Sequence, residues 1–125
     1  MLLDTNILIY MAQPGGESLQ AQMVSASPAA SLIARVEALG FHRITAGERE
    51  RMDKVFAWVE VLPVDDAVAD AAILLRQARR MKLGDALIAA TALLYELPLV
   101  TRNVDDFKHI AGLQIINPFA EPETA

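Results

Sequence analysis

The sequence predicts an α/β protein in which helices cover both faces of a short, parallel central sheet. Short apolar segments of strand length alternate with longer segments of helical periodicity, in the order β-α-α-β-α-α-β-α-α-β-α-β. The strands are short and the helices dominate, as expected for a parallel sheet with a helical layer on each side. Because the chain has no internal repeat and no long linker, these segments are expected to form one domain.

The composition fits a single folded domain with an ordinary core. The chain has 125 residues, and its 54% hydrophobic content argues against disorder. No apolar stretch reaches the roughly 20 residues needed to cross a bilayer. Neither end has the pattern of a signal peptide, so a cytoplasmic protein without a membrane partner is expected. Cysteine is absent and there are two histidines, so any bound metal should have oxygen ligands, as Mg²⁺ or Mn²⁺ does.

The charged residues give a net charge of −5, which by itself disfavours a nucleic-acid partner. The positive charges are nevertheless clustered, with four at residues 76–82 and four more at residues 43–54. A solvated helix face explains each cluster most simply. Basic groups beside a cleft of carboxylates could also hold a polyanion through a bridging metal.

The first half of the chain begins with two leucines that lead directly into Asp4, Thr5 and Asn6. This is the pattern of a short buried strand that turns into a helix over residues 7–11. Asp4 is either the cap of that helix or a ligand for a positive group. The next segments predict a helix at residues 17–24, a weak strand at 29–32 and a helix at 33–39 that ends at Gly40.

In the second half, Thr45-Ala46-Gly47-Glu48 is a capping box for a helix that continues to about Glu60. Pro63 marks the strand at 61–64 as an edge or a strand start. A helix at 85–94 is apolar on nearly every side and should be buried, with Asp85 at its start. The remaining segments predict a helix at 65–80, a strand at 97–101, a polar turn at 102–107, an edge strand at 114–117 and a loose tail at 118–125.

Glu37 occupies an unusual place in the predicted helix at residues 33–39. Its neighbours one helical turn away are Ile33, Ala34 and Phe41, so the carboxylate shares a face with apolar groups. A carboxylate in such a position is costly unless it is paired, protonated or bound to a metal. A structural pairing and a metal-ligand role fit this position equally well.

Polar side chains recur where strands end or buried helices begin: Asp4, Glu37, Asp85 and the turn with Asn103 and Asp106. All of them could meet at the carboxyl end of the sheet. Several carboxylates in one place cannot all stay ionised without a cation, because like charges raise each other's pKa. Such clusters hold Mg²⁺ together with water ligands, and the metal can activate water and neutralise a phosphodiester.

These residues lie in four motifs: Leu3-Asp4-Thr5-Asn6, Arg35-Val36-Glu37-Ala38-Leu39-Gly40-Phe41, Asp85-Ala86-Leu87-Ile88-Ala89-Ala90-Thr91-Ala92 and Leu99-Val100-Thr101-Arg102-Asn103-Val104-Asp105-Asp106-Phe107. In this order and spacing they resemble the motifs of a PIN domain, and most closely those of the VapC-type toxins of bacterial toxin–antitoxin pairs. Any one motif is a weak signal, whereas the four together are specific. The resemblance spans nearly the whole chain.

The resemblance implies a three-layer PIN-like nuclease domain over residues 1–117. It implies a Mg²⁺- or Mn²⁺-dependent ribonuclease that is inhibited by a cognate antitoxin and is usually a homodimer. In such a protein Asp4, Glu37 and Asp85 would ligate the metal. The fourth family position is often an aspartate and here falls on Asn103. The resemblance therefore does not decide whether a second metal ion binds. Asp106, one helical turn later, could supply the missing charge.

Three functions can be compared with this pattern, and the residues disfavour the second of them. The first is an endoribonuclease that uses a metal-activated water for in-line attack and leaves a 5′-phosphate and a 3′-hydroxyl. Thr5, Asn6 and Thr101 would then orient the acids. The second is a phosphoacceptor signalling domain, which requires paired acids after the first strand and a late lysine, whereas Asp4 is single and Arg102 follows the last motif strand. The third is a PIN-like RNA- or protein-binding module without catalysis; the three acids argue against it, and the substituted fourth position keeps it open.

Overall fold

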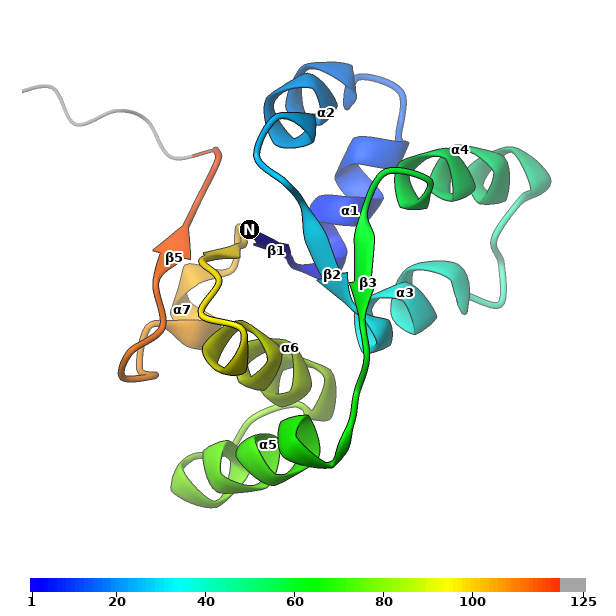
Figure 1. Ribbon diagram of the computed structural model, residues 1–125. Coiled ribbons are helices and arrows are strands. Elements are labelled where there is room, and N and C mark those ends of the chain that lie inside the picture. The colour runs from blue at the N-terminus through cyan, green and yellow to red at the C-terminus, as the bar shows by residue number, and fades with distance from the viewer. Residues whose placement is uncertain (120–125) are drawn as a thin grey trace, which may run out of the picture.

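Five short parallel strands form the central sheet of the protein, whose computed structural model describes residues 1–119 (Figure 1). The strands are β1 (Leu2–Leu3), β2 (Ala29–Ser31), β3 (Glu60–Leu62), β4 (Leu99–Val100) and β5 (Ile115–Ile116). They lie in the order β3-β2-β1-β4-β5, and every neighbouring pair is parallel. The element order along the chain is the one predicted from the sequence, and the α/β prediction is confirmed.

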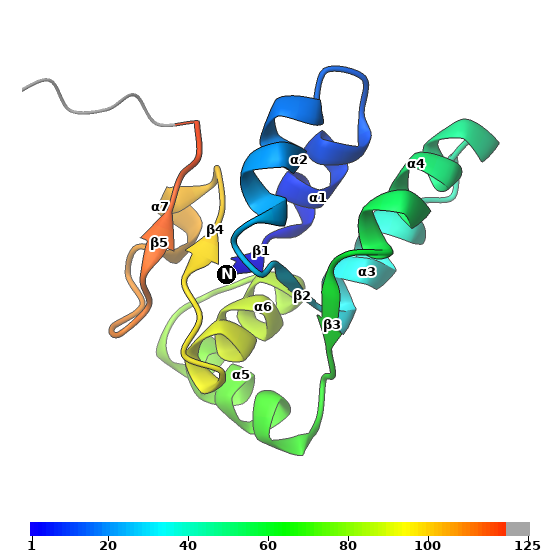
Figure 2. The same cartoon turned by 45° about the horizontal axis from the view of Figure 1, so that its top comes forward.

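The helices form a layer on each side of this sheet, as Figures 1 and 2 show. One layer contains α1 (Thr5–Ala12), α2 (Glu17–Val24), α3 (Leu32–Leu39) and α4 (Ala46–Phe56), and the other contains α5 (Asp66–Ala78), α6 (Leu83–Leu94) and α7 (Val104–Phe107). The division follows from the strand order. The chain moves outward from β1 to β3 and then returns across the sheet to β4 and β5. Right-handed crossovers in opposite directions place their helices on opposite faces.

This reversal of direction falls between β1 and β4, which are hydrogen-bonded neighbours. The chain leaves β1 into one helical layer and leaves β4 into the other, so the two connections diverge and a crevice opens at the carboxyl ends of these strands. Ligands of parallel α/β proteins bind at this type of position. The residues that follow the two strands are Asp4 and Thr101. The topology therefore brings two of the predicted site residues together.

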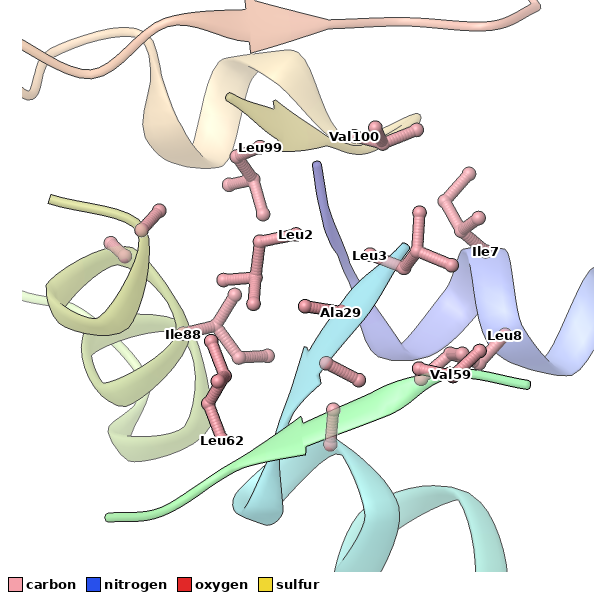
Figure 3. Packing of buried hydrophobic residues seen from close by; sticks show 14 of the residues in the cluster. Leu2, Leu3, Ile7, Leu8, Ala29, Val59, Leu62, Ile88, Leu99 and Val100 are labelled. Atoms are coloured by element: carbon pink, nitrogen blue, oxygen red, sulfur yellow. The ribbon is translucent and has the colours of Figure 1, made fainter. Parts of the chain in front are cut away.

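The core lies on both faces of the sheet and contains Leu2, Leu3, Leu99 and Val100, all with 0% exposure (Figure 3). Burial of each such side chain contributes roughly 1.5–3 kcal/mol. The α6 helix packs on this sheet through small residues and Ile88, which is also buried. Most of the apolar helix predicted at residues 85–94 is thus buried as expected. No helix within residues 1–119 is both long enough and apolar enough to span a bilayer.

Two predicted boundaries around β3 are wrong. The α4 helix ends at Phe56 rather than near Glu60, because the chain there joins the sheet: the N–H of Glu60 donates to Pro28 O at 3.1 Å. The strand then ends at Leu62, whereas a strand over residues 61–64 was predicted. Pro63 has no N–H to continue the ladder. The prediction of an edge strand is confirmed, since β3 lies at one end of the strand order.

Other boundaries differ by a few residues. The β2 strand stops at Ser31, whose hydroxyl caps α3 at the N–H of Ile33. The α5 helix ends at Ala78, and β4 and β5 are shorter than predicted. The predicted polar turn at 102–107 contains the short helix α7. In the predicted loose tail, Phe119 packs edge-to-face against Tyr10 at a centroid distance of 4.8 Å, and residues 120–125 lie outside the described part of the chain.

Candidate active site

Asp4 lies where β1 turns into α1, and two hydrogen bonds fix its carboxylate. The residue is 5% exposed. Oδ1 accepts a hydrogen bond from the N–H of Thr5 at 2.7 Å, and Oδ2 accepts one from the hydroxyl of Thr101 at 2.7 Å. The backbone N–H of Asp4 donates to Val100 O at 3.0 Å. An ionised carboxylate has about four lone-pair positions, so Asp4 caps α1 and retains acceptor capacity for a cation.

Thr101 connects Asp4 to the turn after β4. Its side chain is fully buried; the hydroxyl donates to Asp4 and accepts the N–H of Asn103 at 3.0 Å. Asn103 is the N-cap residue of α7, but its side chain makes no cap hydrogen bond and is exposed. Within residues 1–119, no hydrogen bond joins the side chain of Asn103 or of exposed Asn6 to any of the predicted acids.

Glu37 reaches the same region from α3. Its Oε1 accepts a hydrogen bond from the hydroxyl of Thr5 at 2.8 Å, so the residue after Asp4 holds the second acid. Glu37 is exposed, so its carboxylate does not bear the cost that was expected for a position on an apolar helix face. The buried face of α3 is formed by Ala34 and Ala38, while Phe41 is itself 50% exposed. The carboxylate therefore lies at the solvent side of the site.

Asp85 is the third residue of α6 and is half-buried. The sequence pattern at residues 85–94 also allowed Asp85 to be the N-cap of this helix. The α6 helix begins at Leu83 with Lys82 as N-cap residue, so Asp85 lies in the first turn and does not cap it. Gly84 precedes it and lies directly against Glu37. A Cβ built on Gly84 would be 2.6 Å from Glu37 Oε2, closer than real Cβ contacts. The absence of a side chain at Gly84 thus lets the Glu37 carboxylate lie over the start of α6.

Asp106 completes the group of acids from α7. It is exposed and lines a pocket together with Asp85, whereas its neighbour Asp105 forms an ion pair with Lys108 at 2.9 Å. The negative charges of Asp106 and Glu37 act on both Asp4 and Asp85. Four carboxylates from four separate elements therefore lie near enough for their charges to interact. We refer to Asp4, Glu37, Asp85 and Asp106 as the acid cluster.

The electrostatics of the acid cluster disfavour full ionisation. Burial is the largest cause that raises the pKa of Asp4; the hydrogen bonds from Thr101 and Thr5 oppose it, and the charges of Glu37 and Asp106 add to it. The pKa of Asp85 is also raised, first by burial and then by the charge of Asp4, with Lys82 acting in the opposite direction. Both acids would be stabilised in their ionised form by a cation placed among them.

The donor chemistry of the acid cluster fits a hard divalent cation, since every donor is a carboxylate oxygen. Within residues 1–119, however, no three acidic or histidine side chains converge closely enough to form a ready-made metal cage. The cluster is an open arrangement around Asp4, not a closed set of ligands. Mg²⁺ keeps several of its waters in proteins, so an open carboxylate cluster suits this ion better than ions that require a full protein shell.

Comparison with known proteins identifies the family. The family model for the PIN domain matches residues 1–113. The chain belongs to the PIN-domain family. No curated protein matches the sequence. The resemblance derived from the four sequence motifs is confirmed, both for the PIN domain and for the VapC-type toxins within it.

Several solved structures similar to this PIN domain come from toxin–antitoxin complexes. A toxin–antitoxin complex from Klebsiella pneumoniae has 32% sequence identity and a TM-score of 0.76, covering 94% of this chain and 97% of that one. VapBC-1 from nontypeable Haemophilus influenzae has 26% identity and a TM-score of 0.73, covering 93% and 96%. VapBC2 from Rickettsia felis, bound to a promoter DNA fragment, has 20% identity and a TM-score of 0.76, covering 93% and 96%; at this identity the likeness concerns the fold.

Two features of this PIN domain escaped the sequence analysis. The role of Gly84 depends on the approach of α3 to α6, which local sequence does not encode. His109 has both ring nitrogens buried without a hydrogen-bond partner among residues 1–119. A lone histidine in a short polar segment carries no such signal. Its surroundings, with four basic side chains and Asp85, are also known only from the fold.

Proposed function

We propose that this PIN domain is a Mg²⁺- or Mn²⁺-dependent endoribonuclease and the toxin of a toxin–antitoxin pair. The observation that carries the proposal is the acid cluster: carboxylates from the start of α1, from α3, α6 and α7 act on one another electrostatically, and burial together with this repulsion raises the pKa of Asp4 and of Asp85. A bound divalent cation would supply charge neutralisation for the phosphodiester and lower the pKa of a water molecule.

In this proposal Asp4, Glu37 and Asp85 hold the cation. Thr101 orients Asp4 through its buried hydroxyl, and Thr5 orients Glu37. Mutation of a side chain that hydrogen-bonds to a metal ligand typically lowers metal affinity or activity about 10–100-fold. Asp106 adds a fourth charge at the rim, which compensates for the neutral amide of Asn103. Asn6 has no such contact to support its predicted role.

The test is cleavage of mixed RNA at increasing Mg²⁺ or Mn²⁺, by the wild-type protein and by Asp4→Asn, Glu37→Gln and Asp85→Asn. Each variant should lose RNA cleavage by more than about 100-fold while it stays folded by circular dichroism, because each removes one charge from a shared site. Asp66→Asn is the matched control, since Asp66 is a first-turn acid of α5 outside the acid cluster. Wild-type rates in all three variants would refute the site.

The same assay separates this function from a binding module without catalysis, which the neutral Asn103 favours. Such a module would bind RNA or protein and show no metal-dependent cleavage in the wild type. Asn103→Asp would then be expected to introduce weak activity. Cleavage by the wild type, lost on addition of EDTA, excludes the binding module.

A cognate antitoxin is the protein partner that we propose. The similar structures named above are toxin–antitoxin complexes. A largely apolar groove between α1, α3 and α4 is lined by Ile9, Phe41, Ile44 and Met52 and ends at Glu37. A partner segment in this groove would lie beside the acid cluster and could control access to it. The gene beside this one should encode a small DNA-binding protein, and Phe41→Ser should weaken its complex with the toxin.

Homodimerisation is a further part of the proposal. Large apolar side chains are exposed on adjacent elements, with Val36 on α3 at 57%, Ile73 on α5 at 52% and Leu83 on α6 at 56%. Exposed apolar side chains that gather on one surface are typical of an interaction site. Sedimentation at tens of micromolar (on the order of the Kd of a weak interface) should give a dimer, and Val36→Glu should give a monomer. A wild-type monomer at that concentration would exclude the dimer.

A further inference from the structure

A second pocket adjoins the acid cluster, at the end of α5 and the start of α6. It has a volume of about 530 Å³, and its lining includes Arg76, Arg79, Arg80, Lys82 and His109. Asp85 and Asp106 of the acid cluster line the same pocket. The basic pocket, as we call it, is therefore continuous with the proposed site of RNA cleavage and contributes no residue to the metal-ligand set proposed above other than Asp85.

The four cations of the basic pocket form no ion pair within residues 1–119. The carboxylates of Asp85, Asp105 and Asp106 also line the pocket, and Asp105 is paired with Lys108 instead. Residues 76–82 carry four positive charges and no negative one, in a chain with a net charge of −5. Arg49 and Lys54, by contrast, are both ion-paired.

Arg76 Nε donates to Met81 O at 3.3 Å, which orders the turn. In the described part of the chain, residues 1–119, no such bond holds the guanidinium groups of Arg79 or Arg80. Four positive side chains that line one pocket and form no ion pair favour an anionic ligand there.

The C-terminus of α5 explains only part of this charge. A helix C-terminus favours a cation in its last turn by about 0.3–1 kcal/mol, and the effect falls off within that turn. Arg76 lies in the last turn of α5, but Arg79, Arg80 and Lys82 follow its last residue, Ala78. Stabilisation of the helix therefore does not account for the other three cations.

His109 gives an independent indication of a ligand. Both ring nitrogens are buried and lack a hydrogen-bond partner among residues 1–119, although the side chain lines the basic pocket. A buried polar group without a partner costs roughly 1–3 kcal/mol. If the ring turns toward the pocket when a ligand binds, hydrogen-bonding oxygens of that ligand would remove the cost. The ligand should therefore be an anion with several acceptor oxygens. A phosphodiester is such an anion, and the guanidinium groups of arginine bind phosphate oxygens in a two-pronged geometry.

We propose, building on the nuclease function proposed above, that the basic pocket binds a phosphodiester of the RNA strand next to the one that is cleaved. Arg79, Arg80 and Lys82 contact the phosphate oxygens, and His109 donates a hydrogen bond from the base of the pocket. The RNA substrate must then extend beyond the scissile bond, so that its next phosphate reaches the basic pocket at the end of α5. A nucleotide at the very end of a chain, without that second phosphate, is a poor substrate.

Binding is tested in the Glu37→Gln background with Mg²⁺, because Glu37 is not part of the basic pocket. The probe is a fluorescein-labelled single-stranded uridine decamer, followed by anisotropy. Adding Arg79→Gln and Arg80→Gln should weaken binding on the order of tenfold and reduce the slope of log Kd against log salt by about 1.4, from about 0.7 per phosphate contact. If Glu37→Gln still cleaves the decamer, the nuclease site is wrong while the affinity comparison for the pocket still stands.

Arg49→Gln with Lys54→Gln is the matched control, since it removes two positive charges from α4, where both are ion-paired. It should change the affinity less than twofold. An equal loss in both double variants would indicate a long-range effect of net charge and would overturn the basic pocket. An unchanged affinity in Arg79→Gln with Arg80→Gln would also overturn it.

The two histidines allow a direct observation of the ligand. His109 lines the pocket, whereas His42 is exposed and lies elsewhere. In an NMR titration of the Glu37→Gln protein with the decamer, the imidazole signals of His109 should shift and those of His42 should not. His109→Leu should weaken RNA binding without loss of thermal stability, because an apolar side chain removes two unsatisfied polar atoms. Reduced stability with unchanged RNA affinity would make His109 a packing residue and contradict the assignment.

Discussion

Asp4 and Glu37 bring the same chemical group to the acid cluster but are held in different ways. Asp4 is buried, follows a strand, and receives one hydrogen bond from the backbone and one from the buried Thr101. Glu37 is exposed on a helix and is held by one hydroxyl and by the space above Gly84. The fold therefore fixes one acid rigidly and leaves the others adjustable at the rim. A cation would be anchored at Asp4 and would draw the remaining carboxylates into place.

The largest expected difference between the two acids concerns the threonines that hold them. Thr101→Val removes a donor to the buried Asp4 and also the acceptor for the Asn103 N–H. It should lower RNA cleavage about 10–100-fold and destabilise the fold by about 1–3 kcal/mol. Thr5→Val removes only the exposed hydrogen bond to Glu37 and should cost less than Thr101→Val in both measurements. Paired rate and urea-unfolding measurements test this, and a greater loss in Thr5→Val would reverse the comparison.

Gly84→Ala addresses the exposed side of the cluster without removing any polar group. Its new Cβ would displace the Glu37 carboxylate, and cleavage should fall on the order of tenfold, as for other losses of ligand positioning. The fold should not lose stability, because the contacted atom is the end of a flexible side chain and alanine favours a helix over glycine by about 0.5–1 kcal/mol.

Gly47→Ala is the matched control, at the same second position of helix α4, where a Cβ would meet only Arg51 at 3.4 Å. It should stabilise the protein by a similar amount and leave cleavage unchanged. Equal activities of the two variants would show that Gly84 does not position Glu37.

The turn at α7 should have a smaller effect, on metal affinity and not on the maximal rate. Asp106→Asn removes a charge that acts on both Asp4 and Asp85. It should raise the Mg²⁺ concentration for half-maximal cleavage a fewfold, and Asn103→Asp should lower it. Asp105→Asn serves as the control, because Asp105 is paired with Lys108. Unchanged metal dependence in Asp106→Asn, together with an inactive Asp85→Asn, would restrict the site to three acids.

The smallest expected effect is on stability without metal. The pKa of Asp4 and of Asp85 is raised above the ordinary 3.8. Each folded-state carboxyl therefore binds more protons than its unfolded counterpart between 3.8 and its raised pKa, and the free energy of unfolding falls as pH rises through that window. Below 3.8 the penalty is absent; above the raised pKa it is complete.

Asp85→Asn should accordingly raise the melting temperature in EDTA at pH 7.5 by about 1–4 °C, and the gain should vanish as the pH is lowered toward 3.8. Asp66→Asn, also in the first turn of a helix, should bring no gain because it only removes a favourable interaction with the helix dipole. A lower melting temperature for Asp85→Asn at pH 7.5 would contradict the repulsion within the cluster.

The sequence predicted the position of the buried Asp4 better than that of the exposed Glu37. Asp4 follows a two-residue apolar strand, so its place at the sheet is decided by local pattern and by the topology of parallel sheets. Glu37 was expected to be buried from its helical neighbours, but the face it shares with Phe41 is open to solvent. Helical periodicity shows which residues share a face, and it does not show whether another element covers that face.

The order of the elements could be predicted from the sequence, but several of their boundaries could not, because contacts between distant residues decide them. The end of α4 is decided by the pairing of Glu60 with β2, a contact between distant residues. The start of α6 at Leu83 leaves Lys82 as a cap residue without a side-chain hydrogen bond, so no local capping signal marks it. The approach of Gly84 to Glu37 and the environment of His109 depend on how helices of different motifs pack, and no single motif contains that information.

The most direct test of the account is Mn²⁺ binding, measured by electron paramagnetic resonance or calorimetry on the wild type and on Asp4→Asn, Glu37→Gln and Asp85→Asn. The account predicts saturable binding in the wild type, which is lost in Asp4→Asn and in Asp85→Asn. It predicts weaker but detectable binding in Glu37→Gln, because that ligand lies at the exposed rim. Mn²⁺ binding of equal strength in all four proteins would contradict the claim that these carboxylates share one cation.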